Sequence, residues 1–167
     1  HLARRAWCRT YQTVFRIALP ILPYTEPRIL EHAEDVPAVL QKRSIKHVLI
    51  VTDPGIARLG LTASLESALA AKGIGVTVYA ETRANPTVSN VEEAAALYRE
   101  NDCRAIIGFG GGSAMDCAKG VGARIAQPNK PINKMRGLLR VHRLLPLLIA
   151  VPTTAGTGSE VTLAAVT

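Results

Sequence analysis

The sequence predicts an α/β domain with a doubly wound, mostly parallel sheet. Short apolar runs rich in β-branched residues alternate with helical segments between residues 34 and 151. A run that is apolar at every position suits a strand covered by helices on both faces, as in a parallel sheet. The length of 167 residues fits one domain, and 48% apolar residues exclude a disordered chain.

The elements follow in order along the chain. Strands are expected over residues 47–52, 75–79, 105–109 and 147–151, and helices over residues 34–43, 61–72 and 113–126. Gly73 is the expected stop of the second helix. Another helix is expected after the turn Asn85-Pro86-Thr87, because Ser89 and Glu92 have capping-box spacing. Residues 127–143 predict a loop with a short helix.

The N-terminal segment predicts an amphipathic extension over residues 1–19, followed by a dinucleotide-binding domain over residues 20–167. Apolar residues stand at helical spacing between arginines: Trp7, Tyr11, Val14, Phe15 and Ala18. An arginine-rich start without acids also fits an organelle transit peptide. The absence of serine and the apolar stripe favour packing on the domain or on a partner subunit. Because residue 1 is His, we expect the true start upstream.

The net charge of +7 raises the question of nucleic-acid binding. The excess lies in two acid-free segments, with four arginines in residues 1–25 and five basic residues in residues 127–143. Without these nine, 11 basic and 13 acidic residues remain, a net charge of −2. Neither segment interleaves aromatic and basic residues in a way that suggests base stacking. We therefore expect no nucleic-acid partner and interpret both segments as solvated or subunit-facing surface.

Location is predicted from the cysteines and from hydropathy. Cys8, Cys103 and Cys117 form no CxxC pair, and an odd count favours reduced thiols in the cytoplasm. Buried or idle thiols are the expected state of all three. No apolar run approaches the roughly 18 residues of a spanning helix, so no membrane association is expected.

The most informative stretch is Gly110-Gly111-Gly112-Ser113, between the strand at 105–109 and the helix at 113–126. Glycine lets the backbone approach a ligand closely, and a helix N-terminus attracts anions. The Walker pattern is absent, and the dinucleotide fingerprint GxGxxG fails at its third position, Ser113. A turn that only starts the helix is the alternative. Three successive glycines favour phosphate binding.

Two more groups follow strand ends, where ligands gather in doubly wound sheets. Asp53 follows the first strand and could accept a bond from a ribose hydroxyl, or could form an Asx turn into Pro54-Gly55. A loop after the last strand offers hydroxyls for phosphate and ribose or for local caps: Thr153, Thr154, Thr157 and Ser159.

No catalytic site is visible in the sequence. The four histidines have no metal-binding spacing among them, and there is no GxSxG nucleophile elbow. Asp116 and Lys119 have the i,i+3 spacing of a helical ion pair.

Together these motifs resemble the iron-containing (group III) alcohol dehydrogenase family. The resemblance covers residues 45–167 and rests on four stretches: Val51-Thr52-Asp53, Asn85-Pro86-Thr87, Gly110 to Lys119, and Pro152 to Thr162. It implies a Rossmann-like N-terminal domain similar to that of dehydroquinate synthase. It also implies an enzyme that oxidises an alcohol or reduces an aldehyde, and we expect a homo-oligomer.

The resemblance also implies roles for single residues. Asp53 would bind the adenosine ribose and favour NAD over NADP. Gly111, Gly112 and Ser113 would bind the pyrophosphate. The remaining cofactor contacts would be Asn85, Thr153, Thr154, Thr157, Thr162 and Val166. The family holds Fe²⁺ or Zn²⁺ with an aspartate and three histidines of a helical domain, and the metal polarises the alcohol oxygen. This chain lacks those ligands, so we expect a metal only in the full-length enzyme and no activity from the fragment.

Two alternatives stay open at this point. A branch related to dehydroquinate synthase or glycerol-phosphate dehydrogenase would share the fold, although the stretch from Thr153 to Glu160 favours the alcohol dehydrogenase branch. A free-standing, non-catalytic nucleotide-binding module is the other.

Overall fold

The computed structural model describes residues 27–135, 140–141, 143–156 and 158–159. Four parallel strands form one sheet in the order β2-β1-β3-β4. The strands are β1 (His47–Val51), β2 (Gly75–Tyr79), β3 (Ala105–Gly110) and β4 (Leu147–Pro152). The α-helices are α2 (Val36–Lys42), α3 (Pro54–Arg58), α4 (Ala63–Ala70), α5 (Val88–Glu100) and α6 (Gly112–Ala126), with 3-10 turns η1 (Ala33–Asp35) and η2 (Ile132–Met135).

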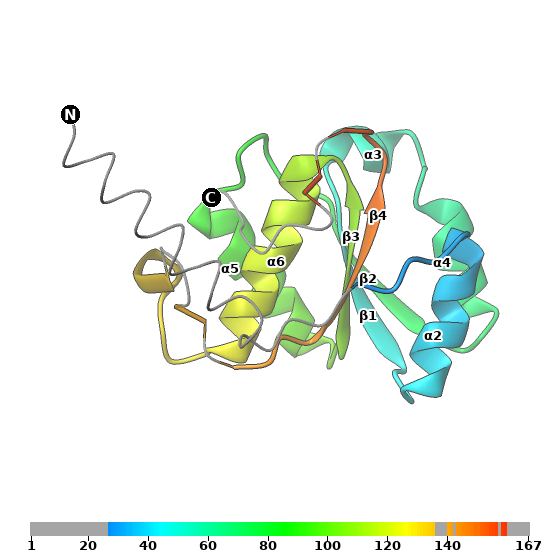
Figure 1. Cartoon of the computed structure of the whole chain (residues 1–167), viewed down its shortest axis with the longest axis horizontal. Helices are drawn as coiled ribbons and strands as arrows, with labels where there is room; N and C mark the ends of the chain where they lie inside the picture. Colours follow the sequence, from blue (N-terminus) through cyan, green and yellow to red (C-terminus); the bar gives the residue numbers. More distant parts are fainter. Residues whose placement is uncertain (1–26, 136–139, 142, 157, 160–167) are drawn as a thin grey trace, which may run out of the picture.

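Helices cover both faces of the sheet, which confirms the predicted fold class. Figure 1 shows α5 and α6 on one face and α2 and α4 on the other. Side chains of β1 alternate between the two resulting cores: Leu49 and Val51 face α5 and α6, whereas Val48 and Ile50 face the other layer. These four residues are fully buried, as a continuous apolar run predicts.

The chain changes direction across the sheet at β1. It runs from β1 to β2 on one side and then crosses to β3, which pairs with β1 on the other side. In doubly wound sheets such a reversal is the expected place of a ligand crevice, beyond the carboxyl ends of the two strands, here β1 and β3. The loops that begin at Asp53 and Gly110 therefore flank the same crevice.

Most element bounds agree with the predicted ones to within two residues, and the exceptions have local causes. Helix α3 was not predicted, because Pro54 and Gly55 are turn signals and the helix has only five residues. The predicted capping box of Ser89 and Glu92 is wrong. Thr87 is the N-cap of α5 and Asn90 completes the box, two residues before the predicted pair. Gly73 has φ +69°, in agreement with its predicted role as a helix stop.

The N-terminal extension, residues 1–19, lies outside the described residues, and its predicted helix stays a prediction. The predicted short helix within residues 127–143 is present as η2.

Candidate functional site

The turn after β3 depends on glycine at Gly110. Its φ of +143° lies in a region that side chains disfavour. A Cβ placed there would lie 3.0 Å from the Cβ of Ala114 and 3.3 Å from Oδ2 of Asp53. The backbone of Gly110 therefore runs directly against the Asp53 carboxylate at the carboxyl ends of β3 and β1.

Helix α6 begins at Gly112, and its N-cap, Gly111, provides no side-chain cap. The helix has 15 residues, and its first internal bond runs from the Met115 amide to the Gly111 carbonyl at 3.2 Å. The first amides of α6, including those of Gly112 and Ser113, therefore have no side-chain cap, and the positive end of the helix dipole lies at this edge of the sheet. This arrangement suits a phosphate group.

Asp53 serves as the N-cap of α3. Its Oδ1 accepts hydrogen bonds from the amides of Gly55 at 2.8 Å and Ile56 at 3.1 Å. The Asx-turn interpretation is thus correct for this oxygen. Within the described part of the chain Oδ2 has no hydrogen-bond donor, and it faces Gly110. One carboxylate can therefore hold the turn with one oxygen and accept a ligand hydroxyl with the other.

The loop after β4 is tied to the glycine turn. The Thr153 amide donates to the Gly110 carbonyl at 2.9 Å. The Thr154 hydroxyl oxygen lies 3.2 Å from the position that a Cβ on Gly111 would take. The structure therefore brings together Asp53, Gly111 and Thr154 from three loops at the carboxyl edge. Thr157, Thr162 and Val166 lie outside the described residues.

Asn85 lies at the same edge, on the exposed loop between β2 and α5, with φ +56°. Asparagine tolerates this left-handed conformation better than most residues. No hydrogen bond between described residues links Asn85 to the glycine turn. Its place in the crevice therefore stays a prediction.

A buried polar network that the sequence reasoning missed holds this loop. The Asn90 Nδ2 donates to the Tyr79 hydroxyl at 2.9 Å and to the Glu81 carbonyl at 3.0 Å, while its Oδ1 accepts from the Thr87 amide at 3.1 Å. Tyr79 donates to the Glu93 carboxylate at 2.7 Å. Burial, and then this hydrogen bond, raise the pKa of Tyr79 well above its usual range, so the phenol remains a donor. The Thr-x-x-Asn spacing was the only local signal for the network.

Thr52 adds an unpaired group at the end of β1. The residue is fully buried, and its hydroxyl has no partner among the described residues. Its backbone is held by bonds to Tyr79 and Thr82. Such an orphaned hydroxyl is uncommon in folded proteins, and this one directly precedes Asp53.

The other predicted side-chain features concern structure. Asp116 and Lys119 form the predicted ion pair on α6, at 3.5 Å. Cys103 and Cys117 are buried and free, and Cys8 lies outside the described residues. Burial raises the pKa of the Cys117 thiol to about 11, which leaves it protonated and unreactive at neutral pH.

The described part of the chain has neither a metal-ligand cluster nor a membrane-spanning helix. It brings no three His, Cys, Asp or Glu residues together as a possible metal site. It also has no helix with the length and apolarity needed to cross a bilayer.

Known proteins share this architecture. The sequence matches the iron-containing alcohol dehydrogenase family over residues 29–167. It is 39% identical over 122 residues to the probable alcohol dehydrogenase EutG of Salmonella typhimurium, covering 73% of this chain and 31% of that protein. It is 38% identical over 123 residues to alcohol dehydrogenase 4 of Schizosaccharomyces pombe, covering 74% of this chain and 29% of that protein.

Two solved structures resemble the chain closely. An alcohol dehydrogenase from Oenococcus oeni superposes with a TM-score of 0.73 at 36% identity, over 78% of this chain and 34% of that one. A sulfoacetaldehyde reductase from Bifidobacterium kashiwanohense, solved in complex with NAD⁺, superposes with a TM-score of 0.69 at 30% identity. That match covers 83% of this chain and 38% of the reductase.

The chain matches only part of each relative and spans about a third of the relative's length. Within that part, the family match includes all three loops of the crevice and every strand of the sheet. The chain belongs to the iron-containing alcohol dehydrogenase family.

Proposed function

We propose that this chain is the cofactor-binding part of an NAD-dependent and metal-dependent oxidoreductase that acts on an alcohol or aldehyde. The observation that carries the proposal is the uncapped glycine start of α6, which opens into the crevice beside the Asp53 carboxylate. The similar sulfoacetaldehyde reductase that was solved with NAD⁺ supports the choice of cofactor.

A dinucleotide fits the groups at this edge of the sheet. The amides of Gly111, Gly112 and Ser113 would hold its pyrophosphate, because the helix start offers donors and a positive dipole end. Thr153 and Thr154 would line the cleft across from the glycine turn. Asn85, Thr157, Thr162 and Val166 are proposed as further contacts on the grounds of family resemblance.

Asp53 would select NAD over NADP. Its Oδ2 can accept a ribose hydroxyl, whereas a 2′-phosphate would meet a negative charge at that position. Bound there, the cofactor supplies hydride transfer to or from the substrate carbon. The protein residues supply binding and orientation, and the Oδ1 bonds to α3 keep the carboxylate in place.

The metal dependence is proposed from the family alone. The described residues offer no metal-binding cluster, so no step proposed here passes through a metal. We propose Fe²⁺ or Zn²⁺ for the full-length enzyme, held by residues outside the described ones. The small alcohol or aldehyde substrate, the homo-oligomeric state, the cytoplasmic location and the absence of a nucleic-acid or membrane partner stay predictions.

The test is a titration of the chain with NAD⁺ and NADP⁺, for the parent and for Asp53→Asn. Asparagine keeps an oxygen that can cap α3 but removes the charge, so the fold should hold. The parent should prefer NAD⁺ by roughly 1–3 kcal/mol, and the variant should lose most of that preference. Equal affinities of the parent for both cofactors would remove Asp53 from the proposed site.

A further inference from the structure

A second concave site lies at the opposite edge of the sheet. It is a hollow of about 250 Å³ lined by Gln127, Pro128, Asn129, Lys130 and Arg143; we name it the basic hollow. Helix α6 starts at the carboxyl edge and has 15 residues, so its end lies roughly 22 Å from the glycine turn. The hollow is therefore separate from the crevice described above.

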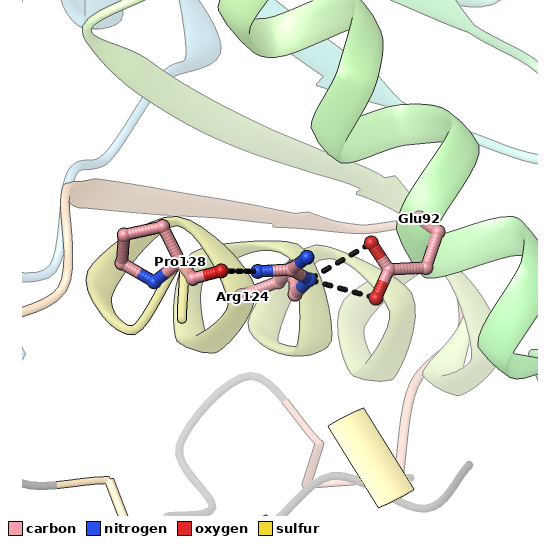
Figure 2. Close-up of polar contacts among 3 residues, drawn as sticks. All are labelled: Glu92, Arg124 and Pro128. Carbon is pink, nitrogen blue, oxygen red and sulfur yellow. Dashed lines mark hydrogen bonds and ion pairs between the residues drawn. The ribbon is translucent and has the colours of Figure 1, made fainter. Parts of the chain in front are cut away.

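Hydrogen bonds fix both sides of the basic hollow. Figure 2 shows the Arg124 Nε donating to both carboxylate oxygens of Glu92, at 2.7 and 2.8 Å. Its Nη1 donates to the Pro128 carbonyl at 2.6 Å. Lys130 donates through Nζ to the Arg140 carbonyl at 3.0 Å, which ties the two sides together. The backbone around the hollow is thus held in place before any ligand binds.

The charge of the basic hollow is positive. The residues that line it include two cations, Lys130 and Arg143, and no acid. The Arg143 guanidinium has no hydrogen-bond or ion-pair partner in the part of the chain that the structure describes. Lys130 uses only one of its three ammonium protons in the bond to Arg140. The Arg143 guanidinium and the Lys130 ammonium therefore both line the hollow, one as a planar group of donors and the other as a compact charge.

These groups select the chemistry of the ligand. A guanidinium and an ammonium that converge on one concave site suit an oxyanion with more than one charge. No Phe, Tyr or Trp occurs in residues 127–143, so the strongest stacking partners for a base are missing. The volume also suits a small anion better than a polymer. We propose that the basic hollow binds a small, multiply charged oxyanion of the phosphate class, independently of the nucleotide.

Amide chemical-shift mapping of the ¹⁵N-labelled chain with inorganic phosphate tests this site. Phosphate can also bind at the start of α6, so the readout must separate the amides of Asn129 and Lys130 from those of Gly112 and Ser113. We expect saturable shifts at Asn129 and Lys130 with a Kd of about 1 mM. Sodium chloride at equal ionic strength should not reproduce them.

Variants make the assignment specific. Arg143→Met and Lys130→Met should each weaken phosphate binding at the basic hollow about tenfold and leave the shifts at Gly112 unchanged. Lys72→Met is the matched control, since this exposed lysine lies after α4, and it should change neither site. Melting temperatures of all variants report on folding.

Three results would overturn the proposal. The first is the absence of saturable shifts at Asn129 and Lys130, and the second is an unchanged Kd for these shifts in Arg143→Met. The third is binding of a single-stranded oligonucleotide to the hollow where phosphate fails, which would make the ligand class wrong.

Discussion

Helices α5 and α6 begin at the same edge of the sheet and pack against each other, but they begin in opposite ways. At the start of α5, the Thr87 and Asn90 side chains satisfy each other's backbone in a capping box. At the start of α6, Gly111 provides no side chain. The sheet thus supports one helix start that is closed by its own residues and one that is open to a ligand.

The difference separates stability from function. A capped helix N-terminus contributes about 1 kcal/mol to folding and has fewer free donors for a ligand. A glycine N-cap leaves its neighbours' amides exposed for an anion. Substitutions at α6 should therefore change cofactor binding, whereas substitutions at α5 should change the free energy of unfolding.

The largest effect is expected from Gly111→Val. The Cβ would come within 3.2 Å of the Thr154 hydroxyl, and the branched side chain would cover the first amides of α6. NAD⁺ affinity should fall by more than about 3 kcal/mol, beyond a hundredfold. Calorimetric titration measures this, and circular dichroism checks the fold. Ser113→Ala keeps the amide and should lose less than about fivefold. A folded Gly111→Val variant that binds NAD⁺ normally would show that the glycines only form the turn and do not bind the cofactor.

Asn90→Ala should give the next largest effect, on stability. It leaves the buried Tyr79 hydroxyl and the Glu81 carbonyl without a donor and removes half of the capping box. We expect a loss of about 2–3 kcal/mol in urea unfolding. Ser89→Ala is the control, because exposed Ser89 is not the cap and should cost almost nothing. Equal losses for the two variants would contradict the observed box.

The two helix starts also show what sequence alone can predict. Strands β1 and β3 were predictable because every residue in their apolar runs is buried by helices on two faces. The glycine turn was predictable because successive glycines have few structural uses. The cap at Thr87 was missed because Asn90 replaces the usual Glu or Gln of the box. The bond between Tyr79 and Glu93 joins residues on a strand and a helix, so no local pattern predicts it.

Asp53 shows a further limit of pattern reading. Its position after β1 fitted both an Asx turn and a ligand contact, and nothing in the spacing could decide between them. In the folded chain its two oxygens have different surroundings, one bound to the α3 amides and the other facing Gly110. The Asx turn and a ligand contact therefore do not exclude each other, because one carboxylate oxygen can form the turn while the other remains available to a ligand.

The pH dependence of the free energy of unfolding tests the burial of one side chain on α6, the Cys117 thiol. Cys117 is fully buried on α6, and burial raises its thiol pKa from 9.0 to about 11. The unfolded thiol ionises first, so this contribution to stability is complete below pH 9 and is lost between pH 9 and 11. Within that window Cys117→Ala should flatten the decline by up to about 1.4 kcal/mol per pH unit. Urea midpoints at several pH values measure the slope. Identical slopes in parent and variant would show that the thiol is not responsible.

The smallest effect is expected at Thr87, and it tests the difference between the starts of α5 and α6 most directly. Thr87→Ala removes the hydroxyl that accepts from the Asn90 amide at 3.3 Å, and it should cost about 1 kcal/mol of stability. Thr87→Ser keeps the hydroxyl and should retain most of it. Because Thr87 itself is not a proposed cofactor contact, NAD⁺ affinity should stay within about twofold in both variants. Paired urea unfolding and cofactor titration would check this. A large loss of NAD⁺ binding in Thr87→Ala at unchanged stability would mean that the closed helix start also belongs to the cofactor site.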